Sequence, residues 1–390
     1  TLTVVSVIAL SAGMLLSPNI SNLLFQQAEY AYIIKLLLIN SVLQILITNI
    51  QTLLKLQSKA LYYSLVSILK LTITLILTIY FIVGLGEKLD GIFEAQLIGS
   101  SIALIVLIPY SLRNSRMKIE LRILIQMLDY SWPLMLASIS GVFFSVIDRY
   151  SLNYLEGLEK VGVYTLGYKI SSALKVIVIT SIQLALSPLL MKKTNEPDHK
   201  SYYAKVMTYF SIILMFCVIG VSLFSLEVIK VAARDIIYWE SANIVAILSF
   251  SFFFSMLKDS AFIGLQIVKR TKIAGLLITL SSLINLGLNI LLIPRFSIYG
   301  AAIATLLSQV IFFIMIYFSA QRYYRIPYEL KIVFFQLVVG TIIVGLGFLV
   351  NDLSIGLRLI FKVLLLGAYP VYLYLSKIIS PKGISELLKG

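Results

Sequence analysis

Long apolar stretches separated by short polar segments run along the whole sequence. Breaks at clusters of charged residues, Gly and Pro delimit twelve such stretches. Most approach or exceed the roughly 20 residues that a helix needs to cross a bilayer core. They lie near residues 1–17, 31–52, 61–84, 91–111, 132–154, 161–190, 203–225, 241–268, 273–293, 298–320, 331–350 and 356–376. Because apolar and polar positions do not alternate as in strands, the pattern predicts an all-α, polytopic membrane protein rather than a β-barrel.

A different pattern occurs between two of these spans. Leu226 to Glu240 mixes Lys230, Arg234 and Asp235 with Val, Ile and Trp239. Charged and apolar residues interleaved over so short a segment are typical of a helix that lies in the membrane interface. We therefore predict an interfacial helix there.

The composition supports the membrane assignment. Of the 390 residues, 59% are hydrophobic and only 13% are charged, about half the charged fraction of a soluble domain. The single cysteine, Cys217, excludes a disulfide framework, and the single histidine, His199, lies in a charged loop. The residues that a zinc centre or a His-based catalytic triad needs are therefore missing, so we expect no enzyme and no cofactor.

The net charge of +14 indicates how the chain lies in the membrane. Alternate connections carry 19 of the 32 Lys and Arg residues on one side and six on the other. The cation-rich side is cytoplasmic by the positive-inside rule. Both termini then fall on the cytoplasmic side. The excess of Lys and Arg over Asp and Glu is thus explained by membrane topology rather than by nucleic-acid binding.

Several cations fall within the predicted spans themselves. Lys70, Lys169, Lys175 and Lys258 lie deep, whereas Lys35 is near a span end and can snorkel. A charge at such depth costs several kcal/mol unless it faces a wet cavity or a partner. The deep lysines therefore indicate a passage for an anionic or polar substrate.

Polar residues also gather on one face of three spans. These sets are Lys169, Ser172, Thr180, Gln183 and Ser187; Ser138, Gly141, Ser145 and Asp148; and Ser251, Ser255, Lys258, Asp259 and Gln266. Each set recurs at helical spacing. Three helices that each have one polar face can pack around a hydrated chamber.

Two acidic residues are central to this chamber. Asp148 and Lys169 lie at similar depth and could pair across adjacent helices, either as a structural ion pair or as part of the passage. The adjacent Lys258 and Asp259 leave the same two readings open. Asp148 and Asp259 are the candidate carriers if H⁺ or Na⁺ drives transport.

The chain contains an internal repeat in the order of its spans, basic segments and glycines. Gly91 opens the stretch GIFEAQLI and Gly300 opens GAAIATLL, each after a span that has a basic start. Repeats with an even number of spans imply two pseudo-symmetric lobes in parallel orientation around a central cavity.

Three stretches resemble a known family. Asp148–Tyr164 (DRYSLNYLEGLEKVGVY) is similar to the segment joining helices seven and eight of bacterial polysaccharide transporters. Asn285–Pro294 (NLGLNILLIP) and Tyr299–Thr305 (YGAAIAT) resemble their helices eleven and twelve. These are the O-antigen and capsule flippases of the multidrug/oligosaccharidyl-lipid/polysaccharide exporter superfamily. The resemblance implies that twelve of fourteen helices are present and that two precede Thr1.

The resemblance also implies a division of the chain. It assigns an incomplete N-lobe to 1–115 (helices three to six), a cytoplasmic linker to 116–131, a C-lobe to 132–325 (helices seven to twelve) and two further helices with a cytoplasmic tail to 326–390.

The function implied is export of a lipid-linked oligosaccharide, a polysaccharide repeat unit on undecaprenyl pyrophosphate, by alternating access across the bacterial cytoplasmic membrane. Lys is a suitable partner for phosphate. Tyr164 and Tyr168 could stack on sugars or anchor the membrane interface. The implied partners are this substrate, membrane lipids, and the polymerase and glycosyltransferases of the same pathway.

Two other functions remain open. A multidrug or cation antiporter of the same superfamily should have an acid-rich cavity. The spans of this chain instead contain four deep lysines, and their acidic residues are Asp148, Asp259 and the shallow Glu94. A membrane polymerase or acyltransferase usually needs a large external loop or a His/Asp constellation.

Overall fold

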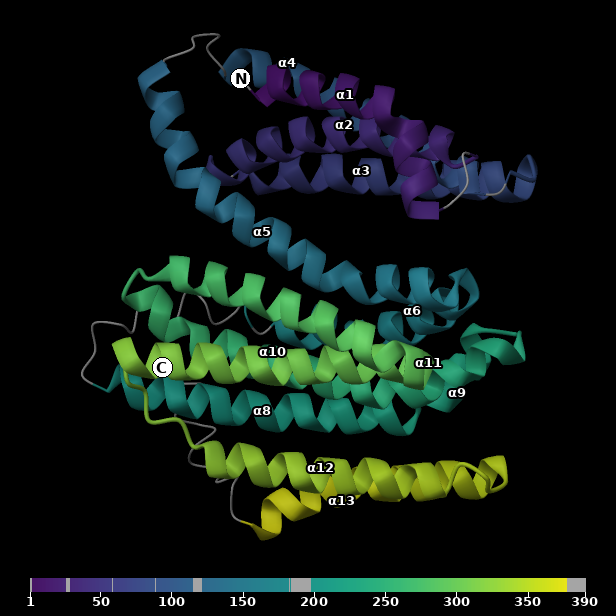
Figure 1. Ribbon diagram of the computed structural model, residues 1–390, viewed down its shortest axis with the longest axis vertical. Coiled ribbons are helices and arrows are strands. Elements are labelled where there is room, and N and C mark those ends of the chain that lie inside the picture. The colour runs from purple at the N-terminus through teal and green to yellow at the C-terminus, as the bar shows by residue number, and fades with distance from the viewer. Residues whose placement is uncertain are drawn as a thin grey trace. The chain divides into compact units, whose positions relative to one another are not determined.

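The computed structural model describes residues 2–25, 29–57, 59–87, 89–114, 121–181, 183 and 198–376. Within these ranges every regular element is a helix (Figure 1). The chain divides into two compact units, Thr1–Ile125 and Gln126–Gly390. The predicted all-α membrane fold is thereby confirmed.

The first unit is built from four helices. They are α1 (Leu2–Phe25), α2 (Ala31–Leu56), α3 (Ala60–Ile79), which continues as the π-helical turn η1 (Tyr80–Gly84), and α4 (Leu89–Asn114). Helix α4 packs against both α2 and α3. A Cβ atom at Gly99 would lie 2.2 Å from the Thr74 hydroxyl oxygen, so a larger residue at this close approach of α4 to α3 would displace the Thr74 side chain. Ile47, Leu54 and Leu107 form the core of the contact.

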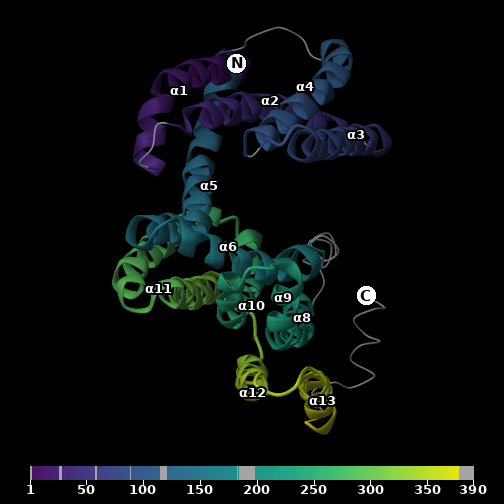
Figure 2. The same ribbon diagram turned by 90° about the vertical axis from the view of Figure 1, so that its right-hand side faces the viewer.

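The second unit contains the remaining helices. They are α5 (Leu121–Glu156), which begins in the first unit, α6 (Leu158–Ala173) with its π-helical continuation η2 (Leu174–Ile179), α8 (His199–Leu223), α9 (Ser225–Ala232), the 3₁₀ helix η3 (Ile236–Glu240), α10 (Ser241–Ile267), α11 (Thr271–Tyr323), α12 (Leu330–Leu349) and α13 (Ile355–Leu375). Figure 2 shows α10 between α11 and α8, and its contacts with both and with α6 make it the central helix of this unit. Leu257 and Phe253 on α10 are almost completely buried.

Helix α11 is two membrane spans joined by a sharp turn. Its 53 residues would extend about 80 Å as one straight helix, whereas a bilayer core is about 30 Å thick. Ser297 breaks the helix with a φ of 49° and a ψ of −129°, three residues after Pro294. A Cβ atom on Gly300 would lie 2.3 Å from the Leu292 carbonyl oxygen, so the reversal depends on glycine. The predicted spans 273–293 and 298–320 are the two arms.

Nine helical segments in the described ranges are long and apolar enough to cross a membrane. One of them contains both arms of α11. Helices α1 and α5 cover the predicted spans at 1–17 and 132–154 but are not among the nine.

The predicted interfacial helix over 226–240 is in fact two short helices, α9 and η3. The chain breaks between them because the Asp235 side chain accepts a hydrogen bond of 3.1 Å from the backbone N–H of Ile237 and starts the second helix. Such local hydrogen bonding by Asp competes with helix continuation.

Candidate functional site

Asp148 is the most completely enclosed acidic side chain among the described residues, with 2% of its surface exposed. Its Oδ2 atom accepts hydrogen bonds from the Thr305 hydroxyl at 2.6 Å and the Tyr164 hydroxyl at 2.9 Å. Its Oδ1 atom accepts one from the Asn289 amide at 2.8 Å. The same amide group lies 3.3 Å from Oδ1 of Asn285. Three donors thus hold one buried carboxylate.

Four helical segments supply this cluster. Asp148 is on α5, Tyr164 on α6, Asn289 on the first arm of α11 and Thr305 on the second. The turn at Ser297 brings the two arms together, which places Asn289 and Thr305 on the same carboxylate. The sequence points to Asp148 by its depth and to Tyr164 as a possible sugar contact. Asn285, Asn289 and Thr305 lie in the stretches that resemble the polysaccharide transporters, but the sequence did not mark them as site residues.

The oxygen atoms around Asp148 are of the kind that hard cations prefer. Oδ1 of Asn289 is buried and has no hydrogen-bond partner among the described residues. It therefore has a free acceptor beside the carboxylate. No group of three or more His, Cys, Asp and Glu side chains suited to a metal ion occurs in the described ranges, so a cation held here would rely on the Asp148 carboxylate together with amide and hydroxyl oxygens.

Asp148 and Lys169, which by depth alone could have paired, form no ion pair in the structure. Lys169 is exposed, whereas Asp148 is buried and receives neutral donors. Of the two readings left open by the sequence, the structural ion pair is therefore not supported, because helical spacing gives the face of a helix but not its neighbours in space. Lys169 is thus a cation without a carboxylate partner within the described residues.

Tyr168 lies beside the cluster and carries a cation on its ring. The guanidinium carbon of Arg149 is 4.2 Å from the Tyr168 ring centroid, a distance typical of a cation–π contact. The ring also approaches Tyr164 at 6.3 Å and Phe252 at 5.7 Å between centroids. Tyr164 itself is fully buried. In this structure its hydroxyl positions Asp148, and its ring is not available for stacking on a sugar.

The predicted polar face of 161–190 is interrupted. Residues Leu174–Ile179 form a π-helix, whose wider turn shifts every later residue around the helix axis. Lys175 lies within this π-helix and is exposed. Because the rotation per residue is not constant at 100° through this π-helix, Lys169 and Gln183 cannot be assigned to the same helix face from their spacing. Ser187 lies outside the described residues.

A second polar group forms around Lys258 and Asp259. The Lys258 ammonium lies 2.7 Å from Oδ1 of Asp259, and the Gln183 amide donates a 2.9 Å hydrogen bond to Oδ2. The same ammonium is 5.0 Å from the Phe312 ring centroid. The structure thus brings together the predicted residues Lys258, Asp259 and Gln183, with the two charges neutralising each other.

Lys70 lies in a polar groove of the first unit, at a distance in sequence from the other candidates. The groove has a volume of about 370 Å³ and is lined by Asn40, Gln44, Ile47, Gln51, Ser67, Lys70, Leu71, Thr74, Gln96 and Ser100. The sequence pointed to Lys70 alone. Asn40, Gln44 and Gln51 recur at the spacing of one helix face, and this pattern could have indicated from the sequence that α2 lines a polar groove.

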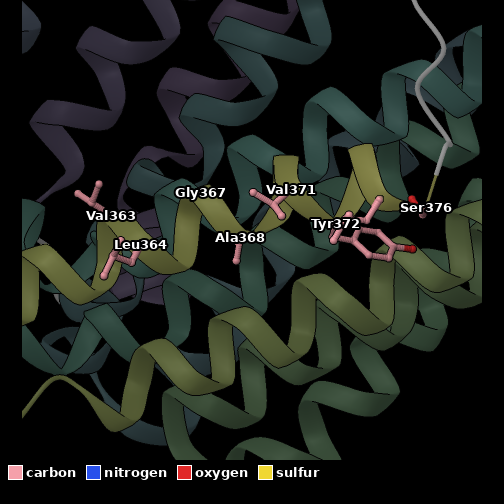
Figure 3. A pocket seen from close by; sticks show the side chains of 8 residues that line it. Val363, Leu364, Gly367, Ala368, Val371, Tyr372 and Ser376 are labelled. Atoms are coloured by element: carbon pink, nitrogen blue, oxygen red, sulfur yellow. The ribbon is translucent and has the colours of Figure 1, made fainter.

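Two further features lie on α13. Its Lys362 and Arg358 side chains both contact Oε1 of Glu227 on α9, at 2.9 and 2.8 Å. Along another face of α13, a groove of about 760 Å³ is lined by Val363, Leu364, Gly367, Ala368, Val371, Tyr372, Leu375 and Ser376 (Figure 3). That lining is largely apolar and supplies no charged group.

The sequence and the fold were compared with known proteins. Residues 1–194 match a family model described as polysaccharide biosynthesis protein. None of the curated proteins matches the sequence.

The fold is similar to solved transporter structures. Lipid II flippase MurJ in an inward closed conformation matches with a TM-score of 0.76 and 15% identity, over 96% of this chain and 82% of MurJ. A MATE protein in the straight conformation matches with a TM-score of 0.58 and 16% identity, over 82% and 76% of the two chains. A MOP superfamily transporter from Pyrococcus furiosus matches with a TM-score of 0.56 and 17% identity, over the same shares.

The proteins with similar folds are transporters, and the described ranges of this chain contain nine helical segments that are long and apolar enough to cross a membrane. Residues 1–194, just under half of the chain, thus match the polysaccharide biosynthesis protein family model, and the fold is similar to the two-lobe fold of the lipid II flippase and the MATE proteins.

Proposed function

We propose that the protein flips a lipid-linked oligosaccharide, a polysaccharide repeat unit carried on undecaprenyl pyrophosphate, across the bacterial cytoplasmic membrane by alternating access. The observation that carries the proposal is the match of residues 1–194 to the polysaccharide biosynthesis family. The likeness to a lipid II flippase supports the same class of substrate, a saccharide on a lipid.

The intramembrane charges fit such a substrate. Lys70 and Lys169 have no carboxylate partner within the described residues, whereas Lys258 is neutralised by Asp259. Lysines that are not neutralised inside a span favour an anionic group, such as a pyrophosphate, in the passage. We assign passage roles to Lys169, Lys175 and Lys70, and to the Lys258–Asp259–Gln183 group as a polar segment of the route.

Asp148 is the proposed carrier of the coupling cation, H⁺ or Na⁺. A buried carboxylate is costly when charged unless it is paired or hydrogen-bonded. The three donors that reach Asp148 reduce this cost, and binding of a cation would remove it. Because donors come from α6 and both arms of α11, a change at the carboxylate alters the packing of three helical segments and so couples cation binding to conformation.

A multidrug or cation antiporter is the second candidate. The MATE-like fold and the buried Asp148 favour it. It predicts an acidic passage, whereas the groove at Lys70 contains no carboxylate among its lining residues. We therefore place it second. A polymerase and glycosyltransferases of the same pathway are the proposed partners.

The test is translocation by the purified protein in proteoliposomes. Undecaprenyl pyrophosphate bearing a short fluorescent glycan should move between leaflets at a rate at least tenfold above that of empty liposomes. Movement of a cationic drug without movement of the glycan lipid would assign the antiporter function instead.

A further inference from the structure

The groove at Lys70 is formed entirely by three helices of the first unit. Its polar side chains recur at helical spacing on each wall: Asn40, Gln44 and Gln51 on α2; Ser67, Lys70 and Thr74 on α3; and Gln96 and Ser100 on α4. Three polar helix faces that line one groove in a membrane-spanning bundle need water or a polar ligand between them. An apolar groove of the same size would have been cheaper to build in lipid.

Part of this polar surface is already hydrogen-bonded to itself. Ser100 donates to Oδ1 of Asn40 at 2.7 Å, and the Gln44 amide donates to the Ser100 hydroxyl at 3.2 Å. The Gln51 amide donates to the Ser67 hydroxyl at 3.3 Å. These bonds orient the amide groups across the groove. Amides and hydroxyls both donate and accept, which matches the hydroxyl groups of a sugar.

Other groups in the groove have no protein partner. The Thr74 hydroxyl oxygen is buried and has no hydrogen-bond partner within the described residues. Lys70 has no carboxylate partner there, and the lining contains no acidic residue. The one carboxylate nearby in sequence on α4, Glu94, accepts a 2.7 Å hydrogen bond from Tyr32. The groove therefore has a single, uncompensated positive charge.

Lys70 is also deep in the membrane-spanning segment. It lies nine residues from one end of the Leu61–Gly84 span and fourteen from the other, about 14 and 21 Å along the helix. At this depth a lysine cannot easily extend its ammonium group to either interface. Its charge must be solvated within the groove or met by a ligand.

We propose that this groove is a subsite for a sugar that carries an oxyanion. Lys70 contacts the anionic group, and the side chains of Asn40, Gln44, Gln51 and Gln96 contact the hydroxyls. The oxyanion is either a carboxylate on the sugar or the phosphate that links the sugar to its lipid. This assignment rests on the proposed function and adds to it a defined place of recognition in the first unit.

The size of the groove limits the ligand. A volume of about 370 Å³ equals that of about twelve water molecules, and a hexose has about twelve non-hydrogen atoms. The volume lies at the low end of the range for ligand pockets, about 300–1,000 Å³. One sugar with its anionic substituent fits, and a longer glycan would extend beyond the groove.

The first experiment measures translocation by the full chain in proteoliposomes with two substrates. Both are undecaprenyl pyrophosphate-linked, one bearing glucose and the other glucuronic acid. Lys70→Gln should lower the rate at least tenfold for the glucuronic acid substrate alone if the carboxylate is bound, or equally for both if the phosphate is bound. Lys35→Gln, which removes an exposed lysine of α2 outside the groove, is the matched control. A Lys70→Gln rate within twofold of that control on both substrates overturns the proposal.

The second experiment does not depend on translocation. A thiol is placed in the groove by Ser67→Cys in a Cys217→Ser background, which removes the only native cysteine. Glucuronic acid or glucose 1-phosphate should slow modification of this thiol by a water-soluble reagent at least threefold relative to glucose, and Lys70→Gln should abolish the protection. Protection without any translocation would refute the proposed function and leave the subsite standing. No protection by either anion refutes the subsite, whatever the translocation result.

Discussion

The Thr305 hydroxyl donates a 2.6 Å hydrogen bond to Asp148, which lies 157 positions earlier in the chain. Thr305 also donates to the Ala301 carbonyl one turn back in its own helix. The hydroxyl is therefore shared between the helix backbone and a buried carboxylate. This contact links the arm of α11 that follows Ser297 to α5, and it makes Asp148 sensitive to movement of either segment.

Replacing Asp148 with Asn should abolish cation-dependent transport. The amide keeps the shape of the carboxylate and can accept from Tyr164 and Thr305, but it can neither bind Na⁺ strongly nor carry a proton. We expect the rate in proteoliposomes to fall at least tenfold and to lose its dependence on a Na⁺ or pH gradient. Asp352→Asn, at an exposed aspartate after α12, is the control. A gradient dependence that survives in Asp148→Asn would place the coupling site elsewhere.

Lys169→Ala should abolish surface glycan in a complementation assay while leaving the protein at normal membrane abundance. Because the Lys169 side chain is exposed and forms no ion pair within the described residues, removing it leaves no buried charge without a partner. Surface substitutions of this kind change stability by no more than about 0.5 kcal/mol. Glycan staining and membrane immunoblotting measure the two quantities. A loss of abundance would instead indicate a structural role.

Glu227→Gln should destabilise the second unit. Lys362 is 1% exposed, and both it and Arg358 pair with this one carboxylate. Breaking a buried pair by removing one partner costs about 3–5 kcal/mol, because the remaining charge is left uncompensated. Thermal unfolding followed by the fluorescence of Trp132 and Trp239 should show a lower Tm. The double variant Glu227→Gln/Lys362→Met should recover part of the loss, and a Tm equal to wild type in the single variant would contradict this account.

The orientation can be tested with single cysteines in the Cys217→Ser background. Lys193→Cys, which lies outside the described residues, should react with an impermeant thiol reagent only after cells are permeabilised. Glu159→Cys, in the exposed first turn of α6, should react in intact cells. The expectation follows from the excess of Lys and Arg in the connections on one side. The reverse labelling pattern would invert the topology and place the C-terminus outside.

The sequence was a better guide to single residues than to their partners. Depth within a span drew attention to Asp148, Lys258 and Lys70, since a charged residue in an apolar stretch is visible in the local sequence. The possible pair of Asp148 and Lys169 does not form, because a shared depth does not specify which helices are neighbours. The Lys258–Asp259 contact succeeded because its two residues are adjacent in the chain.

What the sequence determined by itself is the membrane location, the helical class and the placement of most spans. Lipid offers no partners for backbone N–H and C=O groups, so an apolar stretch of sufficient length must satisfy them within its own helix. That requirement is local and can be read from hydrophobicity. The surroundings of Asp148 and Lys70 were decided only by tertiary structure. They depend on the turn at Ser297 and on the close approach of α4 to α3 at Gly99, which bring distant residues together through backbone geometry that hydrophobicity does not encode.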